Sequence, residues 1–453
     1  MKPVPWSAGL LVALLAVAGC KGVSTEGERA SRRDLKTVAD AYRPDNRKPE
    51  LPVLTPDSTL SNLLAYALLN SPKVEAAFYD WSATVDRITV DRSLPDPQLL
   101  FQAYIQKVVT SLMPGLQQQF PGPGKLKARA NVTTAESQGK YFAFESAVLE
   151  SALDLKRAYY ELCFLTERLE IDRETLALLN DLEQIARAQN AVGKGTLQDV
   201  LRAQIERDRV GTEIADLEDT RRPKLAAYKG ALGLTRDQPD PPTPARVELA
   251  AAYPDMEKLL DTAFERNPRL KAMEADVRAA EASIAVAYKE RIPDFNLALM
   301  ADVKASPVLY WPQASMSLPI WRDKLAAEVS EAKANQLAAQ ARLTGEQIAL
   351  TVEFAEKSFA WREINRNLAL LQNQLIPKGR QSLEIARAGY LSGSIDFFNL
   401  MDAQRTLLGF RMDEVEGRTQ REITLAELSL WIAGIPPVGA PLLPAAPNGK
   451  SAP

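Results

Sequence analysis

Apolar side chains recur at helical spacing over two long tracts of the chain, about residues 125 to 190 and 323 to 390. Both tracts carry apolar residues seven apart, namely Leu155, Leu162, Leu169 and Leu176 in the first and Phe354, Trp361, Leu368 and Leu375 in the second. Such seams predict long helices that pack as left-handed coiled coils, with a kink or the loss of one backbone hydrogen bond at Pro377. Return helices are predicted at about 197 to 232 and 396 to 433, so each tract forms one arm of a helical hairpin.

Two shorter stretches, about residues 97–120 and 294–319, show alternation instead, which is weaker and Gln-rich in the part that leads up to Phe120. Each follows a Pro-Asp pair, and in the second stretch Phe295, Leu297 and Leu299 alternate with mostly polar neighbours. A period of two predicts strands with one apolar face, and each stretch is long enough for a β-hairpin. The sequence therefore predicts four β-strands, two in each half of the chain.

The two halves are related by an internal duplication. Four consecutive residues and an Ala-Gln pair recur at one offset of 200 residues, as Ile185 to Ala188 with Ala203-Gln204 and as Ile385 to Ala388 with Ala403-Gln404. A constant offset indicates two copies of one unit, placed at 58–234 and 255–434. A Pro-rich linker at 235–254 joins them, a polar tether is predicted at 20–57, and the tail 435–453 is predicted to be disordered.

Composition removes several classes of function. The net charge is −3, so no basic surface for nucleic acid is expected. The chain contains no histidine, which excludes His-ligated metals and His-dependent nucleophiles, and its carboxylates alternate with Lys and Arg as on solvated helix faces. We therefore expect no catalytic residue, no metal site and no cofactor, and the chain is not predicted to be an enzyme. Cys163, set among leucines, is expected to be a buried core thiol.

The N-terminus resembles a bacterial lipoprotein signal. An apolar run from Ala8 to Ala18 is too short to span a bilayer and ends in Val17-Ala18-Gly19-Cys20, which resembles a lipobox. The resemblance implies a signal peptide at 1–19 and acylation of Cys20, so that the tether is lipidated. Lys21 then suggests sorting to the outer membrane. An ordinary secretion signal with an incidental cysteine is the alternative.

The combination of a secretion signal, short amphipathic strands and very long helices points to a membrane protein whose membrane part is β. No helical stretch offers the unbroken apolar length of a membrane-spanning helix, whereas the strands have the length that a tilted spanning strand needs. Open sheet edges are not tolerated in lipid, and four strands are too few to close a barrel. The chain is therefore expected to assemble with copies of itself.

The order of strand hairpin and helical hairpin, its duplication, and the glycine-containing turns followed by Ala-Gln resemble the TolC family of outer-membrane efflux proteins over roughly residues 58 to 434. The resemblance implies a mainly α fold with a transmembrane β-barrel: a homotrimer whose twelve strands form the barrel and whose helical hairpins form a periplasmic tunnel. It also implies a passive exit duct in the outer membrane of a Gram-negative bacterium. The implied partners are a periplasmic adaptor (membrane fusion protein) and an inner-membrane pump, expected to be of the RND type.

The resemblance assigns roles to the two hairpin turns. The adaptor is expected to dock at the tips, which comprise Val192, Gly193 and Lys194 in the first copy and Ser392, Gly393 and Ser394 in the second. Glycines that serve only to make tight turns are an equally compatible interpretation. Asp199, Asn399 and Asp402 stand where family members carry acids that line the entrance, and Ile395 stands where a latching arginine is common. A solvated acid at a helix N-terminus is the ordinary alternative for Asp199 and Asp402.

The cargo is the least determined property. The segments Leu94 to Gln98 and Phe120 to Lys125 resemble the branch of the family that serves heavy-metal cation pumps, while drugs and secreted proteins, the latter through a type I secretion duct, remain open. A periplasmic coiled-coil lipoprotein without a pore, acting as adaptor or scaffold, is the alternative of a different class. Such a protein would not need duplicated amphipathic strand pairs.

Overall fold

The computed structural model describes residues 24–105, 109–243 and 255–437. These residues form two compact units, each described by itself below. Unit 1 contains residues up to 40 together with 76–144 and 268–347, and unit 2 contains 41–75, 145–267 and the residues from 348 onward. The predicted signal peptide, Cys20 and the predicted tail beyond 437 lie outside the described residues.

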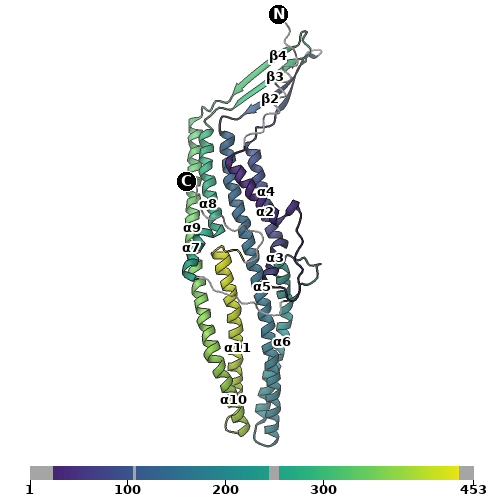
Figure 1. Ribbon diagram of the computed structural model, residues 1–453, viewed down its shortest axis with the longest axis vertical. Helices are drawn as coiled ribbons and strands as arrows, with labels where there is room; N and C mark the ends of the chain where they lie inside the picture. The colour runs from purple at the N-terminus through teal and green to yellow at the C-terminus, as the bar shows by residue number, and fades with distance from the viewer. Residues whose placement is uncertain (1–23, 106–108, 244–254, 438–453) are drawn as a thin grey trace. The chain divides into compact units, whose positions relative to one another are not determined.

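A four-stranded antiparallel sheet forms one end of unit 1, as Figure 1 shows. Its strands β1 (Gln98–Ile105), β2 (Val109–Phe120), β3 (Phe295–Asp302) and β4 (Leu309–Met316) lie in sequence order. One row of partners, Leu99, Leu116, Leu299 and Pro312, crosses all four strands. The leucines of this row are about half exposed or more, so one sheet face presents apolar side chains. The predicted strands and their alternation are therefore confirmed.

The helices of unit 1 are α2 (Glu26–Tyr42, in this unit up to residue 40), α4 (Pro72–Arg92, in this unit from residue 76), the first part of α5 (Lys125–Ala191), α8 (Pro268–Lys289) and the first part of α9 (Arg322–Leu370). Where strands and helices meet, Lys125 binds Glu290 and Asp294 at 2.9 and 3.0 Å. The side chain of Lys125 is almost completely buried, so these two ion pairs fix the start of α5 against the end of α8.

The segment 20–57, predicted to be a polar tether, contains the helix α2 at residues 26–42. Glu28 is buried and pairs with Arg92 of α4 at 2.5 Å and with Arg32 at 3.2 Å. Although burial alone would raise it, these contacts hold the pKa of Glu28 below its ordinary value. Ser31 and Val38 of α2 are buried as well as Glu28, so the buried face mixes polar and apolar side chains, and a search for apolar periodicity alone does not register it.

Unit 2 contains α3 (Leu60–Asn70), α6 (Leu197–Ala231), α7 (Met256–Arg266), α10 (Ile376–Ser392) and α11 (Phe397–Ala426), with the later parts of α5 and α9. The duplication is visible in its contacts. The Asn70 side chain donates to the Leu232 carbonyl, and the Asn267 side chain donates to the Ile432 carbonyl, both at 2.8 Å. Each asparagine thus satisfies a carbonyl at the end of a return helix.

Pro377 does not break the second long tract. A π-helical turn, η2 (Leu371–Leu375), lies just before it, between α9 and α10, and a second, η3 (Glu427–Ile432), follows α11. Proline has no N–H for the regular helical bond, and a wider turn before it accommodates that loss. The predicted local disturbance is present, in the form of a π-helical turn.

Candidate functional site

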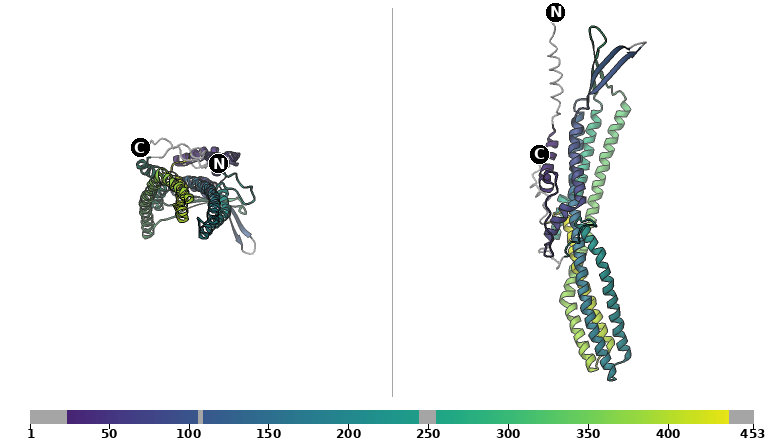
Figure 2. Two further views of the ribbon diagram at one scale, coloured as in Figure 1. Left: turned by 90° about the horizontal axis from the view of Figure 1, so that it is seen from below. Right: turned by 90° about the vertical axis from the view of Figure 1, so that its right-hand side faces the viewer.

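The two helical hairpins, α5 with α6 and α10 with α11, turn at the same end of unit 2 (Figure 2). In the first turn Gly193 has a φ of +72°, and the N–H groups of Lys194 and Gly195 both donate to the Gln189 carbonyl, at 2.9 and 3.0 Å. A side chain on residue 193 would meet open space, so only its backbone conformation requires glycine. Val192, at 69% exposure, and Lys194 project into solvent.

Asp199 forms part of a reciprocal cap at the start of α6. Its backbone N–H donates to the Thr196 hydroxyl at 3.2 Å, while its carboxylate accepts the Thr196 N–H at 3.0 Å. This arrangement satisfies two donors that the helix itself leaves unpaired. The first predicted entrance acid therefore has a definite structural role, which the Thr-x-x-Asp spacing could have indicated.

The second turn has the same backbone but different chemistry. Gly393 has a φ of +80°, and the Ser392 and Ser394 hydroxyls lie 2.9 Å apart. Asp396 caps α11 by accepting the Asn399 N–H at 2.8 Å. This cap is not reciprocal: the hydrogen bond between Asn399 and Asp396 is donated by the backbone N–H of Asn399, whereas in the first turn the side chain of Asp199 also takes part.

The two predicted entrance positions of the second copy, Asn399 and Asp402, share one cavity. It has a volume of about 680 Å³ and lies between α10 and α11, with Lys378, Ile385 and Ile395 among its other lining residues. Asn399 and Asp402 are one helical turn apart on an exposed face of α11. The structure thus brings together these two positions and Ile395, whereas Asp199 lies on the other hairpin.

A hydrophobic core holds the two hairpins together behind their turns. Its buried members come from all four helices, namely Leu179, Leu182, Ala186, Val200, Ala203, Val210, Ala386, Tyr390, Phe397, Leu400, Met401 and Ala403. Tyr390 packs edge-on against Phe397, with ring centroids 5.2 Å apart. Burial, and secondly the charge of Asp199, raise the pKa of Tyr390, so Asp199 of the first hairpin lies close enough to the second hairpin to act on Tyr390.

Three ion pairs also cross between the hairpins. Arg405, Arg411 and Arg418, spaced about two turns apart on α11, pair with Glu206 on α6 and with Glu174 and Glu167 on α5. The hydrogen bond that Arg405 donates to Glu206, followed by the charges of Glu206 and Asp402, raises the pKa of Arg405. We call this set the hairpin ladder. It was not visible in the sequence, because it depends on the register of one hairpin against the other.

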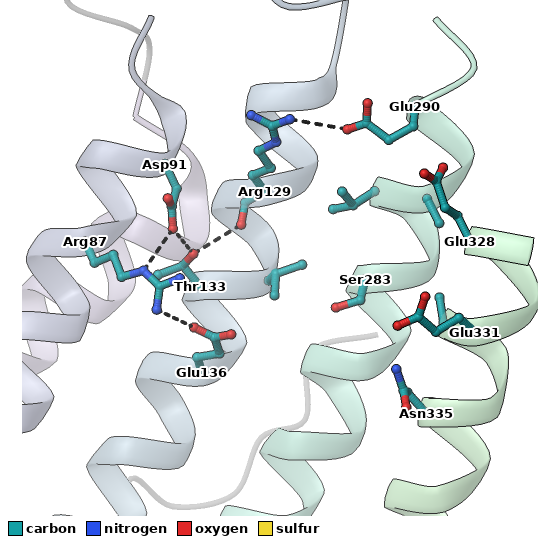
Figure 3. A pocket seen from close by; sticks show the side chains of 14 residues that line it. Arg87, Asp91, Arg129, Thr133, Glu136, Ser283, Glu290, Glu328, Glu331 and Asn335 are labelled. Carbon is teal, nitrogen blue, oxygen red and sulfur yellow. Dashed lines mark hydrogen bonds and ion pairs between the residues drawn. The ribbon is translucent and has the colours of Figure 1, made fainter. Parts of the chain in front are cut away.

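A second cavity lies in unit 1 between α4, α5, α8 and α9, with a volume of about 470 Å³ (Figure 3). On one wall Arg87 pairs with Asp91 and Glu136, at 3.5 and 3.4 Å. On the facing wall, Glu331 of α9 points toward the same space. Within the described residues no group of three or more Cys, Asp or Glu side chains could hold a metal ion.

No helix in the described part of the chain is long and apolar enough to cross a bilayer.

Comparison with known proteins gives consistent matches. The profile of the outer membrane efflux protein family matches residues 63–234 and 259–434. The cobalt-zinc-cadmium resistance protein CzcC of Cupriavidus metallidurans is 21% identical over 374 residues, which cover 78% of this chain and 85% of that protein.

Two crystal structures share the fold. A membrane protein from Pseudomonas aeruginosa superposes with a TM-score of 0.74 at 21% identity, covering 87% of this chain and 93% of that one. The outer membrane protein VceC from Vibrio cholerae has a TM-score of 0.69 at 18% identity, covering 83% and 96%. Both copies of the duplicated unit lie within the family match.

Proposed function

Because the chain belongs to the outer membrane efflux protein family, we propose that it is the outer-membrane exit duct of a tripartite efflux pump. The family and the fold are those of channels, with the four-stranded sheet and the long helices in the expected order. In this function the chain performs no chemistry. Cargo passes through it passively after delivery by an inner-membrane transporter and a periplasmic adaptor.

The sheet is the observation that carries the proposal. Within the described residues β1 and β4 each pair on one side only, which leaves an open edge at either end of the sheet. Open edges and an exposed apolar face are both unfavourable in water, and edges are not tolerated in lipid. Three copies joined edge to edge remove the open edges and give a barrel of twelve strands whose apolar face contacts lipid, and the helical hairpins of the three copies are proposed to form the tunnel.

The hairpin turns then lie at the tunnel entrance. The exposed tips at Val192 to Lys194 and Ser392 to Ser394 are proposed as the adaptor-docking surface, and Asn399 and Asp402 as part of the entrance lining. Three symmetry copies of Asp402 around one axis would favour cations. Because Ile395 cannot form an ion pair, we propose that the hairpin ladder, and chiefly Arg405 with Glu206, holds the closed state.

Metal cations are the proposed cargo. The support is the similarity to CzcC, whose name records resistance to cobalt, zinc and cadmium, together with the Pro-rich segments on either side of the first strand pair. Acylation of Cys20 is proposed to hold the N-terminus at the outer membrane. The helix α2, which packs on α4 through Glu28 and Arg92, then begins a few residues after the anchor.

Two measurements test the function. Purified protein in a planar lipid bilayer should show discrete conductance steps, whereas a coiled-coil scaffold without a pore should show none. Deletion of the gene should sensitise the native strain to divalent metal ions, and the wild-type gene should restore resistance. Conductance without metal sensitivity would keep the exit duct and reject the cargo; the absence of conductance would reject the duct itself.

A further inference from the structure

The junction between sheet and helices in unit 1 is basic, although the whole chain carries a net charge of −3. The four segments that connect strands to helices, residues 93–97, 121–129, 287–294 and 317–325, contain seven basic and four acidic residues. Figure 1 shows that α5, α8 and α9 meet the sheet at the same end, where β2 and β4 end and β3 begins. These charges are therefore collected at one level of the unit.

Some of these cations are explained by contacts within the chain. Lys125 is buried against Glu290 and Asp294, and Arg129 pairs with Glu290 at 3.3 Å. Five basic residues remain. Lys289 is half-buried, and the other four are Lys127, Arg291, Arg322 and Lys324, which we call the junction cations. All four are exposed, and the ion pair recorded for them among the described residues joins Lys324 and Glu328 at the long distance of 3.6 Å.

Local helix energetics do not favour two of the junction cations. Lys127 lies in the first turn of α5, which contains no acidic residue, and Arg322 is the first residue of α9. The partial positive charge at a helix N-terminus favours acids there and disfavours cations. Asp323 offsets this in α9, but nothing in α5 offsets Lys127. A negatively charged partner outside the chain would account for both positions.

Exposed aromatic side chains stand beside these cations. Trp321 is 72% exposed and directly precedes Arg322, and the Arg291 guanidinium lies 5.3 Å from the centre of the Tyr288 ring. Tryptophan and tyrosine next to arginine and lysine are typical of the level at which a membrane protein leaves the hydrocarbon and meets lipid headgroups.

We propose that the junction cations bind the headgroups of anionic phospholipids on the side of the membrane that faces the helices. This inference rests on the proposed placement of the sheet in the membrane. Lys127 and Arg322 approach the phosphate groups, Arg291 and Lys324 add to the local positive potential, and Trp321 lies among the headgroups. Exposed contacts of this kind strengthen with the fraction of anionic lipid and weaken with salt.

Quenching of tryptophan fluorescence by brominated lipids tests the proposal on the full chain. The protein is reconstituted in phosphatidylcholine vesicles that contain an equal fraction of brominated phosphatidylglycerol or brominated phosphatidylcholine. The signal of Trp321 is obtained by difference against Trp321→Phe. Trp311, which is 53% exposed on β4, reports independently whether the sheet is in the membrane.

The chain offers a matched pair of double variants on the same two helices. The test variant is Lys127→Gln with Arg322→Gln, close to the sheet. The control is Lys140→Gln with Lys333→Gln, which removes exposed cations of α5 and α9 about 15 to 20 Å further along those helices. Circular dichroism and size-exclusion chromatography confirm that both remain folded and assembled.

We expect the brominated anionic lipid to quench Trp321 more strongly than the zwitterionic one. The preference should fall by up to about fivefold for each junction cation removed, should persist in the control, and should disappear at about 0.5 M salt. Equal quenching by the two lipids, with Trp311 also quenched, overturns the inference and leaves the membrane placement intact; acids of a neighbouring copy would then be the partners. Loss of the preference in both double variants also overturns it. If neither tryptophan is quenched, the proposed function fails as well.

Discussion

Replacing Asp172 with asparagine should stabilise the first helical hairpin at neutral pH. The Asp172 side chain in α5 has no exposed surface, and neither of its carboxylate oxygens has a hydrogen-bond partner among the described residues. Burial, and then the nearby Glu213 carboxylate, raise the pKa of Asp172 from the ordinary 3.8 to about 6, against the opposing charge of Arg168. The ionised form of Asp172 is therefore destabilised in the folded protein relative to the protonated form.

The size of the effect follows from the shift in pKa. A rise of about two pKa units corresponds to about 3 kcal/mol of difference between the two protonation states. The folded state binds the Asp172 proton more tightly than the unfolded state does. The stability that this protonation contributes is therefore fully present below about pH 4 and is lost as the pH rises through about 6. An asparagine amide stays neutral but still lacks a partner, so we expect Asp172→Asn to recover only about 1 to 2 kcal/mol above pH 6.

Hydrogen exchange measured by mass spectrometry reports the local change in stability, on peptides that cover residues 165–180. At about pH 7.5, after correction for intrinsic rates, exchange in Asp172→Asn should be about 5 to 30 times slower than in the wild type. The difference should shrink as the pH approaches about 4.5. Asp181→Asn, which alters an exposed acid of the same helix, should match the wild type at every pH.

Equal protection of wild type and Asp172→Asn across this range would refute the reasoning. It would mean that Asp172 has a partner in the assembled protein that holds its carboxylate ionised at no cost. Faster exchange in the variant at neutral pH would lead to the same conclusion, because replacing a well-paired carboxylate with a neutral amide lowers the stability of the folded protein.

Three further predictions concern the proposed duct. Arg405→Glu should weaken the contact of α11 with α6 by about 1 kcal/mol, since Arg405 is half exposed, and should raise the open probability in planar bilayers about fivefold. Adding Glu206→Arg should restore the closed state; failure of the double variant to do so would count against the hairpin ladder as a latch. Gly393→Ala forces a side chain into a φ of +80° and should cost about 1 kcal/mol in thermal unfolding and reduce adaptor binding, whereas Gly409→Ala, inside α11 with open space around it, should do neither. Cys20→Ser should abolish incorporation of labelled fatty acid, and labelling that survives would exclude Cys20 as the acylated residue.

Much of the fold could be predicted from the sequence, because its signals are local and repeated. The strands follow a period of two, as at Phe295, Leu297 and Leu299, and the long helices follow heptads that extend over several turns. Turn chemistry located the hairpins, since Gly193 and Gly393 occupy the positive φ that the turns need. Where backbone preference and hydrophobic pattern agree over many residues, they specify the secondary structure, and tertiary contacts do not change it.

The polar contacts could not be predicted in the same way. Glu28 is buried because Arg92, 64 positions away, meets it, and the hairpin ladder joins residues about 200 to 250 positions apart. Pairing of this kind depends on how helices are placed against one another, which no local pattern records. The Thr196 and Asp199 cap is different, because its two members are three residues apart, and the position of Asp199 near a helix N-terminus is indicated by the sequence.

The two hairpin turns show how a duplicated unit can keep its shape while its charges diverge. A helix start requires one side-chain oxygen at its first position, which Thr196 supplies in one copy and Asp396 in the other. The return bond from the third helical position is an addition that only Asp199 makes, so the second copy can carry Asn399 there without losing its helix. Asn399 is then free to line the cavity beside Asp402, and of these two positions only Asp402 brings a charge. The copies thus differ in charge at the place where the entrance is proposed to lie, and the difference is compatible with one shared backbone.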